Sequence, residues 1–259
     1  MKTILFILCA LILFSAEAKE RLIYVARHCQ ATGKGKNILR PFRSEAGITQ
    51  LGVQQSKWLG QRLKALKFKG KIYASPYYRT VATASYAASQ CGLKVYPDAR
   101  VQQRCHSDKG NMKKSATLKQ LKKLFPNEIA QDAKLADDWL YRKDEPKGTP
   151  AHRIRMAKAL DEILAENPDG NIMIVSHAGA VGALAAEMQD RCKEKIRGGT
   201  WNCALYKYKV DDNGKFHFLG YDISFLPAEA VTSNMHKIDP KKNPKQQKVK
   251  SGVDYKYEL

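Results

Sequence analysis

Short apolar runs that alternate with helical segments constrain the fold of this 259-residue chain more than any other feature. The runs are "RLIYVA" at 21–26, "KIYAS" at 71–75, "LKVYP" at 93–97 and "NIMIVS" at 171–176, and they are rich in strand-forming residues. Apolar residues at helical spacing predict helices over about 49–67, 78–92, 150–166 and 178–188. Thr149 is expected to cap the third of these helices, with Pro150 at its first position. This alternation predicts one α/β domain with a mostly parallel central sheet that is covered on both faces.

The two ends of the chain differ from this pattern. Residues 1–18 have the features of a secretory signal peptide: Lys2 gives a positive start, an apolar stretch follows, and Ala16-Glu17-Ala18 is a small-x-small cleavage site. No later stretch is apolar enough to span a membrane. We expect a folded domain over 19–232 with an insertion at about 104–148, then a basic flexible tail over 233–259. A secreted or periplasmic location follows, and the ER lumen is the less favoured alternative because "KYEL" only loosely resembles a retention signal.

The charge balance favours anionic partners. Lys and Arg number 45 against 25 Asp and Glu, which gives a formal charge of +20. Phosphate esters, an anionic polymer or an anionic surface would suit this charge, although a solvated basic surface explains it equally well. No motif indicates specific recognition of nucleic acid. In an oxidising compartment, nearness in sequence favours Cys91–Cys105 and Cys192–Cys203 as disulfide pairs, but the connectivity cannot be deduced from the sequence.

Four cationic or imidazole side chains lie where predicted strands end or helices begin. Arg27 and His28 close the first run, Arg79 begins the helix after the second, and His177 follows "NIMIVS". Sites in open α/β sheets form at the carboxyl ends of strands, where arginines and helix N-termini can bind phosphate oxygens. Neutral imidazole can attack phosphorus to give a phosphohistidine. Singly, each residue would be an ion-pair partner or a strand-end histidine, but together they favour a phosphate socket.

Several segments resemble the histidine phosphatase superfamily, in its phosphoglycerate-mutase-like branch. They are "ARHCQATG", "GITQLGVQQSKWLGQRL", "YASPYYRTVATA", "IVSHAGAVGAL" and the closing hairpin "NCALYKYKVDDNGKFHFLGYDISFL", in that order over 22–226. The resemblance implies a three-layer α/β/α sandwich with His28 as the phosphorylated nucleophile. It also implies a phosphate pocket of Arg27, Arg79 and His177. Ser75 and Thr80 are explained well enough by turn formation and helix capping.

Two departures from the family pattern lie in the loop after His28. Cys29 stands where glycine is common, and packing explains a small thiol there better than reactivity does. "CQATG" replaces the frequent glycine-glutamate-threonine sequence, so Ala31 takes the threonine position and Thr32 follows it. Gln30 and Thr32 are the polar residues that this loop could offer on the phosphate side.

The third departure concerns the proton donor. The resemblance places Gln103 where the family usually has a carboxyl group that protonates the leaving oxygen, and an amide cannot do this. Asp108 and Glu45 are possible substitutes, although a role as solvated surface carboxylates explains them about equally well. If Gln103 holds the acid position, aryl and acyl phosphates should be better substrates than alkyl phosphates, because their leaving groups need little protonation.

We therefore expect an exported phosphatase that hydrolyses a small phosphomonoester through a phosphohistidine, without metal or cofactor. No carboxylate-rich or Cys/His cluster has ligand spacing, and two arginines supply the countercharge. The alternative is a non-catalytic protein that binds phosphate or a polyanion on the same fold. The missing acid favours this alternative, while the complete four-residue socket opposes it.

Overall fold

The computed structural model describes residues 20–32, 38–104, 116–136, 145, 150–233 and 236–237. The predicted signal peptide (residues 1–18), Asp108, Cys105 and Thr149 lie outside these residues. The helices are α1 (Gln50–Ala65), α2 (Tyr78–Ser89), α3 (Leu118–Leu124), α4 (Ala151–Ala165) and α5 (Ala178–Cys192), with the short 3-10 turns η1 (Ala99–Val101) and η2 (Ala228–Ala230). The strands are β1 (Arg21–Arg27), β2 (Ala31–Thr32), β3 (Ile38–Leu39), β4 (Gly47–Thr49), β5 (Gly70–Ala74), β6 (Val95–Pro97), β7 (Asn171–Ser176), β8 (Leu205–Val210), β9 (Phe216–Asp222), β10 (Thr232–Ser233) and β11 (His236–Lys237).

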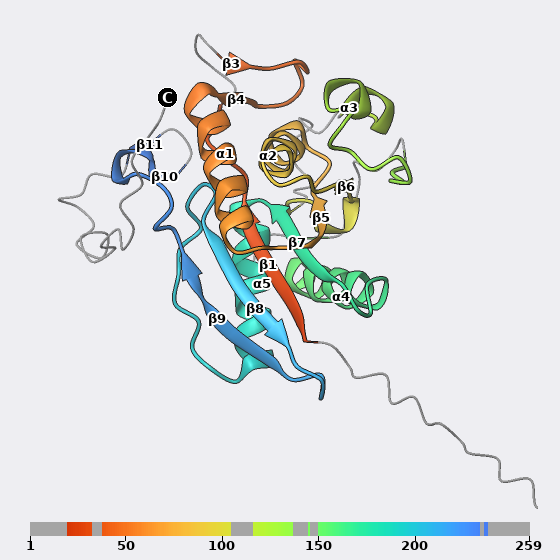
Figure 1. Cartoon of the computed structure of the whole chain (residues 1–259), viewed down its shortest axis with the longest axis vertical. Coiled ribbons are helices and arrows are strands. Elements are labelled where there is room, and N and C mark those ends of the chain that lie inside the picture. Colours follow the sequence, from red (N-terminus) through yellow and green to blue (C-terminus); the bar gives the residue numbers. More distant parts are fainter. Residues whose placement is uncertain are drawn as a thin grey trace, which may run out of the picture.

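A six-stranded sheet in the order β6-β5-β7-β1-β8-β9 forms the centre of the molecule (Figure 1). Strands β6, β5, β7 and β1 run parallel to their neighbours, whereas β8 pairs antiparallel with β1 and β9 antiparallel with β8. The mostly parallel α/β sheet is confirmed. Because β1, β5 and β7 are parallel neighbours, their carboxyl ends meet at one edge of the sheet.

Two separate apolar cores cover the two faces of the sheet. Successive residues of a strand point to opposite faces, so Tyr24 and Ala26 of β1 belong to one core while Ile23 and Val25 belong to the other. Helices α1 and α2 pack into the first core, and α4 and α5 pack into the second. The result is the expected three-layer sandwich.

The segment between β1 and α1 has more structure than the loop predicted from its basic sequence. Strands β2, β4 and β3 form a small antiparallel sheet there. Gly47 allows this pairing, because a Cβ at this position would lie 2.5 Å from the Leu39 carbonyl oxygen. Strands of two or three residues are too short to show an alternating pattern, so the sequence did not reveal them.

Two predicted helix boundaries were slightly wrong. Helix α2 ends at Ser89 rather than at Gly92, because the chain turns through Gln90 before reaching the left-handed Gly92. Pro150 occupies the cap position of α4 rather than its first helical position. At the carboxyl end, Thr232–Ser233 pairs with His236–Lys237, so regular pairing extends past residue 232.

The two suggested disulfides were also wrong, since Cys91, Cys192 and Cys203 are free thiols. Cys192 packs against the core of α4 and α5, whereas Cys203 is buried in the core of α1 and α2. The sheet therefore separates two cysteines that are near in sequence.

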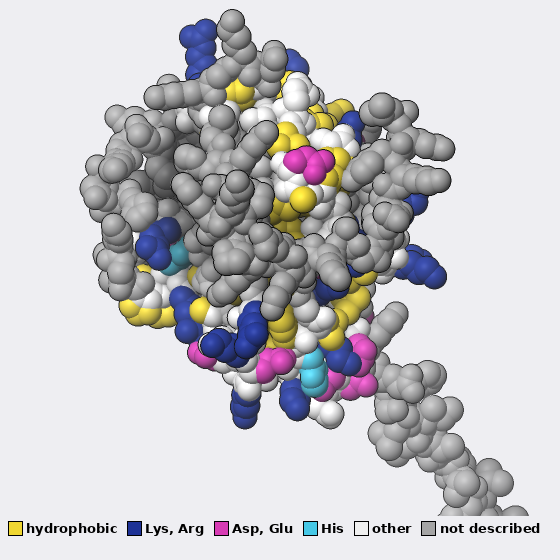
Figure 2. Space-filling view, turned by 90° about the vertical axis from the view of Figure 1, so that its left-hand side faces the viewer, with side chains coloured by type: hydrophobic (Ala, Val, Ile, Leu, Met, Phe, Trp, Pro, Cys, Tyr) yellow, Lys and Arg dark blue, Asp and Glu magenta, His cyan; other side chains and the backbone are white. Residues whose placement is uncertain are grey.

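On one side of the molecule, Lys and Arg side chains lie among Asp and Glu side chains (Figure 2). Ion pairs such as Lys207 with Asp222 and Lys209 with Glu20 link β8 to neighbouring acids. None of the helices within the described residues combines the length and apolar character that crossing a bilayer requires.

Candidate active site

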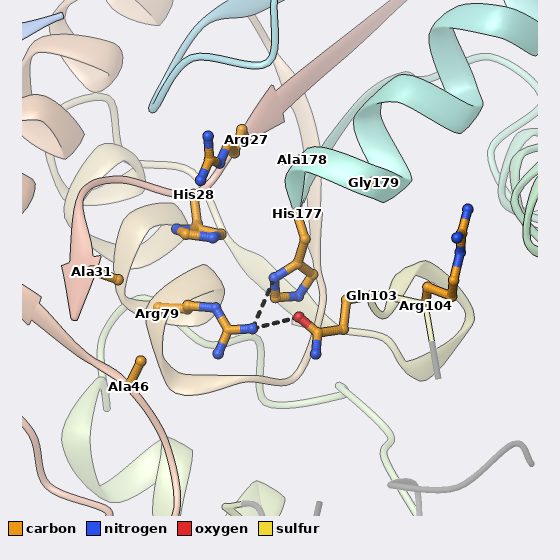
Figure 3. A pocket seen from close by; sticks show the side chains of 10 residues that line it. All are labelled: Arg27, His28, Ala31, Ala46, Arg79, Gln103, Arg104, His177, Ala178 and Gly179. Atoms are coloured by element: carbon orange, nitrogen blue, oxygen red, sulfur yellow. Dashed lines mark hydrogen bonds between the residues drawn. The ribbon is translucent and has the colours of Figure 1, made fainter. Parts of the chain in front are cut away.

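A pocket of about 490 Å³ lies where β1, β5 and β7 end. Its lining residues are Arg27, His28, Ala31, Ala46, Arg79, Gln103, Arg104, His177, Ala178 and Gly179 (Figure 3). The four residues singled out in the sequence thus meet in one place. They arrive there because Arg27 ends β1 and His28 follows it, Arg79 lies in the first turn of α2, and His177 links β7 to α5.

His28 is held in one tautomer. Its Nδ1 lies 2.7 Å from the carbonyl oxygen of Cys29, and since a carbonyl only accepts, Nδ1 carries the proton. The lone pair is therefore on Nε2, which has no hydrogen-bond partner among the described residues. Burial, with the charges of Arg79 and Arg27, holds the pKa of His28 well below its ordinary value. The imidazole is thus neutral and nucleophilic at neutral pH.

The backbone of His28 and the guanidinium of Arg27 are anchored by distant segments. The Asn202 side-chain amide donates to the carbonyl of His28 at 2.8 Å. Arg27 Nη1 donates to the Thr200 carbonyl at 2.6 Å and to the Ser233 hydroxyl at 3.1 Å. Burial, followed by the charge of Arg79, lowers the pKa of Arg27 to about 10, so it remains a cation at neutral pH.

Arg79 and His177 form a hydrogen-bonded pair. Arg79 Nη2 lies 3.1 Å from His177 Nδ1, and because guanidinium only donates, Nδ1 is the acceptor. His177 Nε2 consequently carries the proton and donates to Ser75 Oγ at 2.8 Å. Burial and the nearby charge of Arg79 hold the pKa of His177 well below its usual range. The second imidazole is therefore neutral, with the opposite tautomer to His28.

The pocket suits an anion. Arg27, Arg79 and Arg104 line it together with two imidazoles, and its lining among the described residues contains no carboxylate. Ala178 and Gly179 belong to the first turn of α5, where unpaired backbone N–H groups and the helix dipole favour negative charge. A phosphoryl dianion fits this electrostatic environment.

The possible acids do not line this pocket in the described residues. Glu45 is buried, and its carboxylate accepts from the backbone N–H of Tyr78 at 2.5 Å and of Ala116 at 3.2 Å. This side chain thus satisfies the first turn of α2 and ties the 116–136 segment to it. Gln103 does line the pocket, and its Oε1 accepts from Arg79 Nη2 at 2.7 Å. Asp108 lies outside the described residues.

The proposed phosphate-side contacts of Gln30 and Thr32 are not found in the lining of the pocket. Ala31 faces the pocket instead, and side chains on either side of a strand residue point the opposite way. Gln30 accepts from the Thr49 hydroxyl at 2.8 Å, at the beginning of α1. Cys29 is fully buried, its N–H donates to Thr83 Oγ1, and burial raises the pKa of its thiol, which agrees with a packing role.

Three functional contacts were not recognised in the sequence. Ser75 was assigned to a turn but accepts from His177, Asn202 donates to the backbone carbonyl of His28, and Arg104 lines the pocket. Thr80 does have the local role expected, since its hydroxyl donates to the Ser75 and Tyr77 carbonyls. The missed contacts join residues about 100 or more positions apart in the case of Ser75 and Asn202, so no local pattern could reveal them.

Among the described residues no cluster of three or more His, Cys, Asp or Glu side chains could hold a metal ion.

Comparison with known proteins places this geometry in context. A curated relative described as a probable phosphoglycerate mutase, GpmB of Erwinia tasmaniensis, is 29% identical over 175 residues, covering 63% of this chain and 73% of the relative. The solved ecdysone phosphate phosphatase of Bombix mori, in complex with tungstate, covers 85% of this chain and 98% of its own at 16% identity, with a TM-score of 0.59. A phosphoglycerate mutase structure from Bacillus anthracis gives a TM-score of 0.50 at 17% identity, covering 79% and 93% of the two chains. The family model of the histidine phosphatase superfamily (branch 1) matches residues 23–222, and the chain belongs to that superfamily.

Proposed function

We propose that this protein is an exported phosphatase that hydrolyses a small phosphomonoester through a phosphohistidine on His28. One observation carries the proposal: His28 is fixed with its lone pair on Nε2, beside two arginines that line the same pocket. Membership of the superfamily supports phosphatase-type catalysis.

The first half-reaction is attack of His28 Nε2 on phosphorus. The N–P bond forms while the bond to the leaving oxygen breaks, and that oxygen leaves as an anion that takes a proton from solvent water. Arg27 and Arg79 would bind the equatorial oxygens, where charge must be stabilised during phosphoryl transfer. Nδ1–H donation to the Cys29 carbonyl stabilises the positive charge that develops on the ring. In the second half-reaction water attacks phosphorus, releases inorganic phosphate and returns His28 to its neutral form.

The proposal includes no metal. Two guanidinium groups and the α5 N-terminus supply the positive charge that a metal ion would otherwise contribute. Addition of a chelator should therefore leave the rate unchanged, and loss of activity that returns with a divalent cation would contradict this part of the proposal.

The experiment compares wild type with His28→Ala on an aryl phosphate, with His217→Ala as a matched control. His217 lies in β9 and pairs with Asp211, outside the pocket lining. We expect His28→Ala to lose phosphate release and His217→Ala to retain it. Acid quench of the wild type should trap acid-labile phosphate on His28. A protein that binds phosphate but shows no His28-dependent release would be the non-catalytic binder.

Export is proposed from residues 1–18, whose positive start, apolar stretch and small-x-small site have the composition of a signal peptide. Expression in a bacterial host with and without these residues tests it. Full-length protein should appear in the periplasm or medium with Lys19 as its new N-terminus, while the shortened chain should stay in the cytoplasm. Full-length chain that remains uncleaved in the cytoplasm would refute export.

A further inference from the structure

The chain from Arg100 to Gln103 reaches the pocket with few backbone partners of its own. Only its first two residues belong to the short turn η1. Buried carbonyls need hydrogen-bond donors, and an irregular segment cannot supply them internally. The Val101 carbonyl accepts from Ser176 Oγ at 2.6 Å, at the end of β7.

The other three carbonyls of this segment accept from one side chain, Arg155 of α4. Its Nη1 donates to the Arg100 carbonyl at 2.5 Å, and its Nη2 lies 3.1 Å from the Gln102 carbonyl and 3.2 Å from that of Gln103. Arg155 is only 8% exposed. A single planar guanidinium thus fixes the path of the backbone that carries Gln103.

The charge of Arg155 is balanced by Glu145. The carboxylate accepts from both Nε and Nη2 of Arg155, the latter at 3.1 Å, and Glu145 is 3% exposed. A buried charge without such a partner would be strongly destabilising. Glu145 therefore allows a cation to remain within the protein and bind carbonyls.

From Gln103 the contacts continue into the pocket. Gln103 Oε1 accepts from Arg79 Nη2 at 2.7 Å, and the same nitrogen donates to His177 Nδ1 (Figure 3). Arg155 does not line the pocket. Its hydrogen bonds lead to the pocket by way of the Gln103 backbone, and the Gln103 side chain continues to Arg79.

We propose that Arg155, with Glu145 as its counter-charge, is a positioning residue for the phosphate pocket that acts through Gln103 on Arg79. Its consequence for turnover rests on the proposed phosphatase function, whereas its consequence for phosphate binding does not. Loss of Arg155 frees the Gln103 segment, so Arg79 loses its orienting acceptor and the pocket binds phosphate less well.

The test measures two quantities in Arg155→Met: the Kd for inorganic phosphate by calorimetry, and kcat/KM on an aryl phosphate. Misplacement of a group in an active site by about 1 Å can lower the reaction rate roughly 10²-fold. We therefore expect phosphate affinity and kcat/KM each to fall about tenfold or more. Arg155→Lys, which keeps the charge and can reach one carbonyl, should restore part of the loss. If Arg155→Met does not fold, the comparison of Arg155→Lys with wild type carries the test.

Arg153→Met is the matched control. Arg153 lies on the same helix but pairs with Glu187 and Asp190 near the surface. This variant should keep both the phosphate Kd and kcat/KM. Unchanged values in Arg153→Met would exclude a general effect of removing an arginine from α4.

A double-mutant cycle distinguishes positioning from a structural role. Substitutions of residues in one chain of contacts have non-additive effects. Arg155→Met should therefore reduce phosphate affinity and kcat/KM several-fold less in a Gln103→Ala background than in wild type. Equal losses in the two backgrounds, or an unchanged phosphate Kd in folded Arg155→Met, would overturn the proposal. Absence of turnover in wild type with a weakened Kd in Arg155→Met would refute the phosphatase function but not the positioning role.

Discussion

Two buried imidazoles in the pocket have opposite tautomers, and this difference assigns their roles. His28 carries its proton on Nδ1 because it faces a carbonyl, whereas His177 accepts from a guanidinium on Nδ1. Only His28 therefore presents a free lone pair on Nε2. A backbone carbonyl beside one ring and a guanidinium beside the other, rather than the residue type, decide which histidine could attack phosphorus in the proposed reaction.

NMR titration tests this assignment. We expect ¹⁵N shifts of the Nδ1–H form for His28 and of the Nε2–H form for His177, with both rings still neutral at about pH 6, below the ordinary histidine value. Burial and the charges of Arg79 and Arg27 lower the pKa of His28. Arg79→Gln should therefore raise that pKa, while Arg62→Gln, remote from the pocket lining, should not. Protonation of His28 near its ordinary pKa in wild type would contradict this description.

In the proposed mechanism, the amide of Gln103 limits which leaving groups can be expelled. An amide oriented by Arg79 cannot protonate an alkoxide. In Gln103→Glu a carboxyl group would lie at the same place, and a general acid typically raises the reaction rate about 10²–10⁴-fold. We expect kcat/KM on an alkyl phosphate to rise at least about tenfold, while that on an aryl phosphate changes little.

Gln103→Ala provides the control for this experiment, because it removes the contact with Arg79 without adding a carboxyl group. It should lower activity on both substrates. If Gln103→Glu left the ratio of aryl to alkyl activity unchanged, another group would have to be the proton donor.

At the level of the elements, Glu45 is better explained as the cap of α2 than as an acid. Its carboxylate accepts from the N–H groups of Tyr78 and Ala116. Glu45→Gln would place an amide N–H against one of these donors, which would then lack an acceptor. A buried donor without a partner typically lowers the free energy of unfolding by about 1–3 kcal/mol. We expect a lower urea midpoint but an unchanged ratio of aryl to alkyl activity. A selective loss on alkyl phosphates would instead identify Glu45 as the proton donor.

Close packing of α1 against α2 depends on Gly60. A Cβ there would lie 2.3 Å from the Ala87 carbonyl oxygen, whereas a Cβ at Gly182 of α5 would meet nothing within 4 Å. Overpacking costs about 1–3 kcal/mol, so Gly60→Ala should lower the free energy of unfolding. Gly182→Ala should raise it by up to about 1 kcal/mol, since alanine is the better helix former. Urea denaturation of the two variants should therefore move the midpoint in opposite directions.

The helices were predictable from apolar residues at helical spacing, and the main strands from short continuous apolar runs. The four site residues were predictable because strand ends of a parallel sheet converge, as β1, β5 and β7 do. The contacts made by the residues around the site were not predictable. Ser75 meets His177, and Arg155 meets Gln103, only because the fold brings distant segments together, and neither segment has a local sequence signal for it.

Considered as a whole, the molecule buries a third imidazole beneath this pocket. His152 of α4 is 2% exposed and would lie 3.7 Å from a Cβ at Gly179. Burial and the charge of Arg155 lower its pKa to about 4, against the opposing effect of Glu145. The pKa values of His28 and His177 are lowered in the folded protein as well. The free energy of unfolding therefore depends on the protonation of three buried histidines.

These histidines predict the acid sensitivity of the fold. In the unfolded chain an imidazole protonates near pH 6.5, but His152 in the native protein protonates only near pH 4. Between these values the unfolded state binds more protons, so the free energy of unfolding must fall as pH falls, by up to about 1.4 kcal/mol per pH unit for each such histidine. Urea denaturation at pH 7, 6 and 5 should show this decline, and His152→Leu should flatten it. If the free energy of unfolding of His152→Leu declined with pH as steeply as that of wild type, His152 would make no contribution to the pH dependence. The decline would then have to come from His28 and His177.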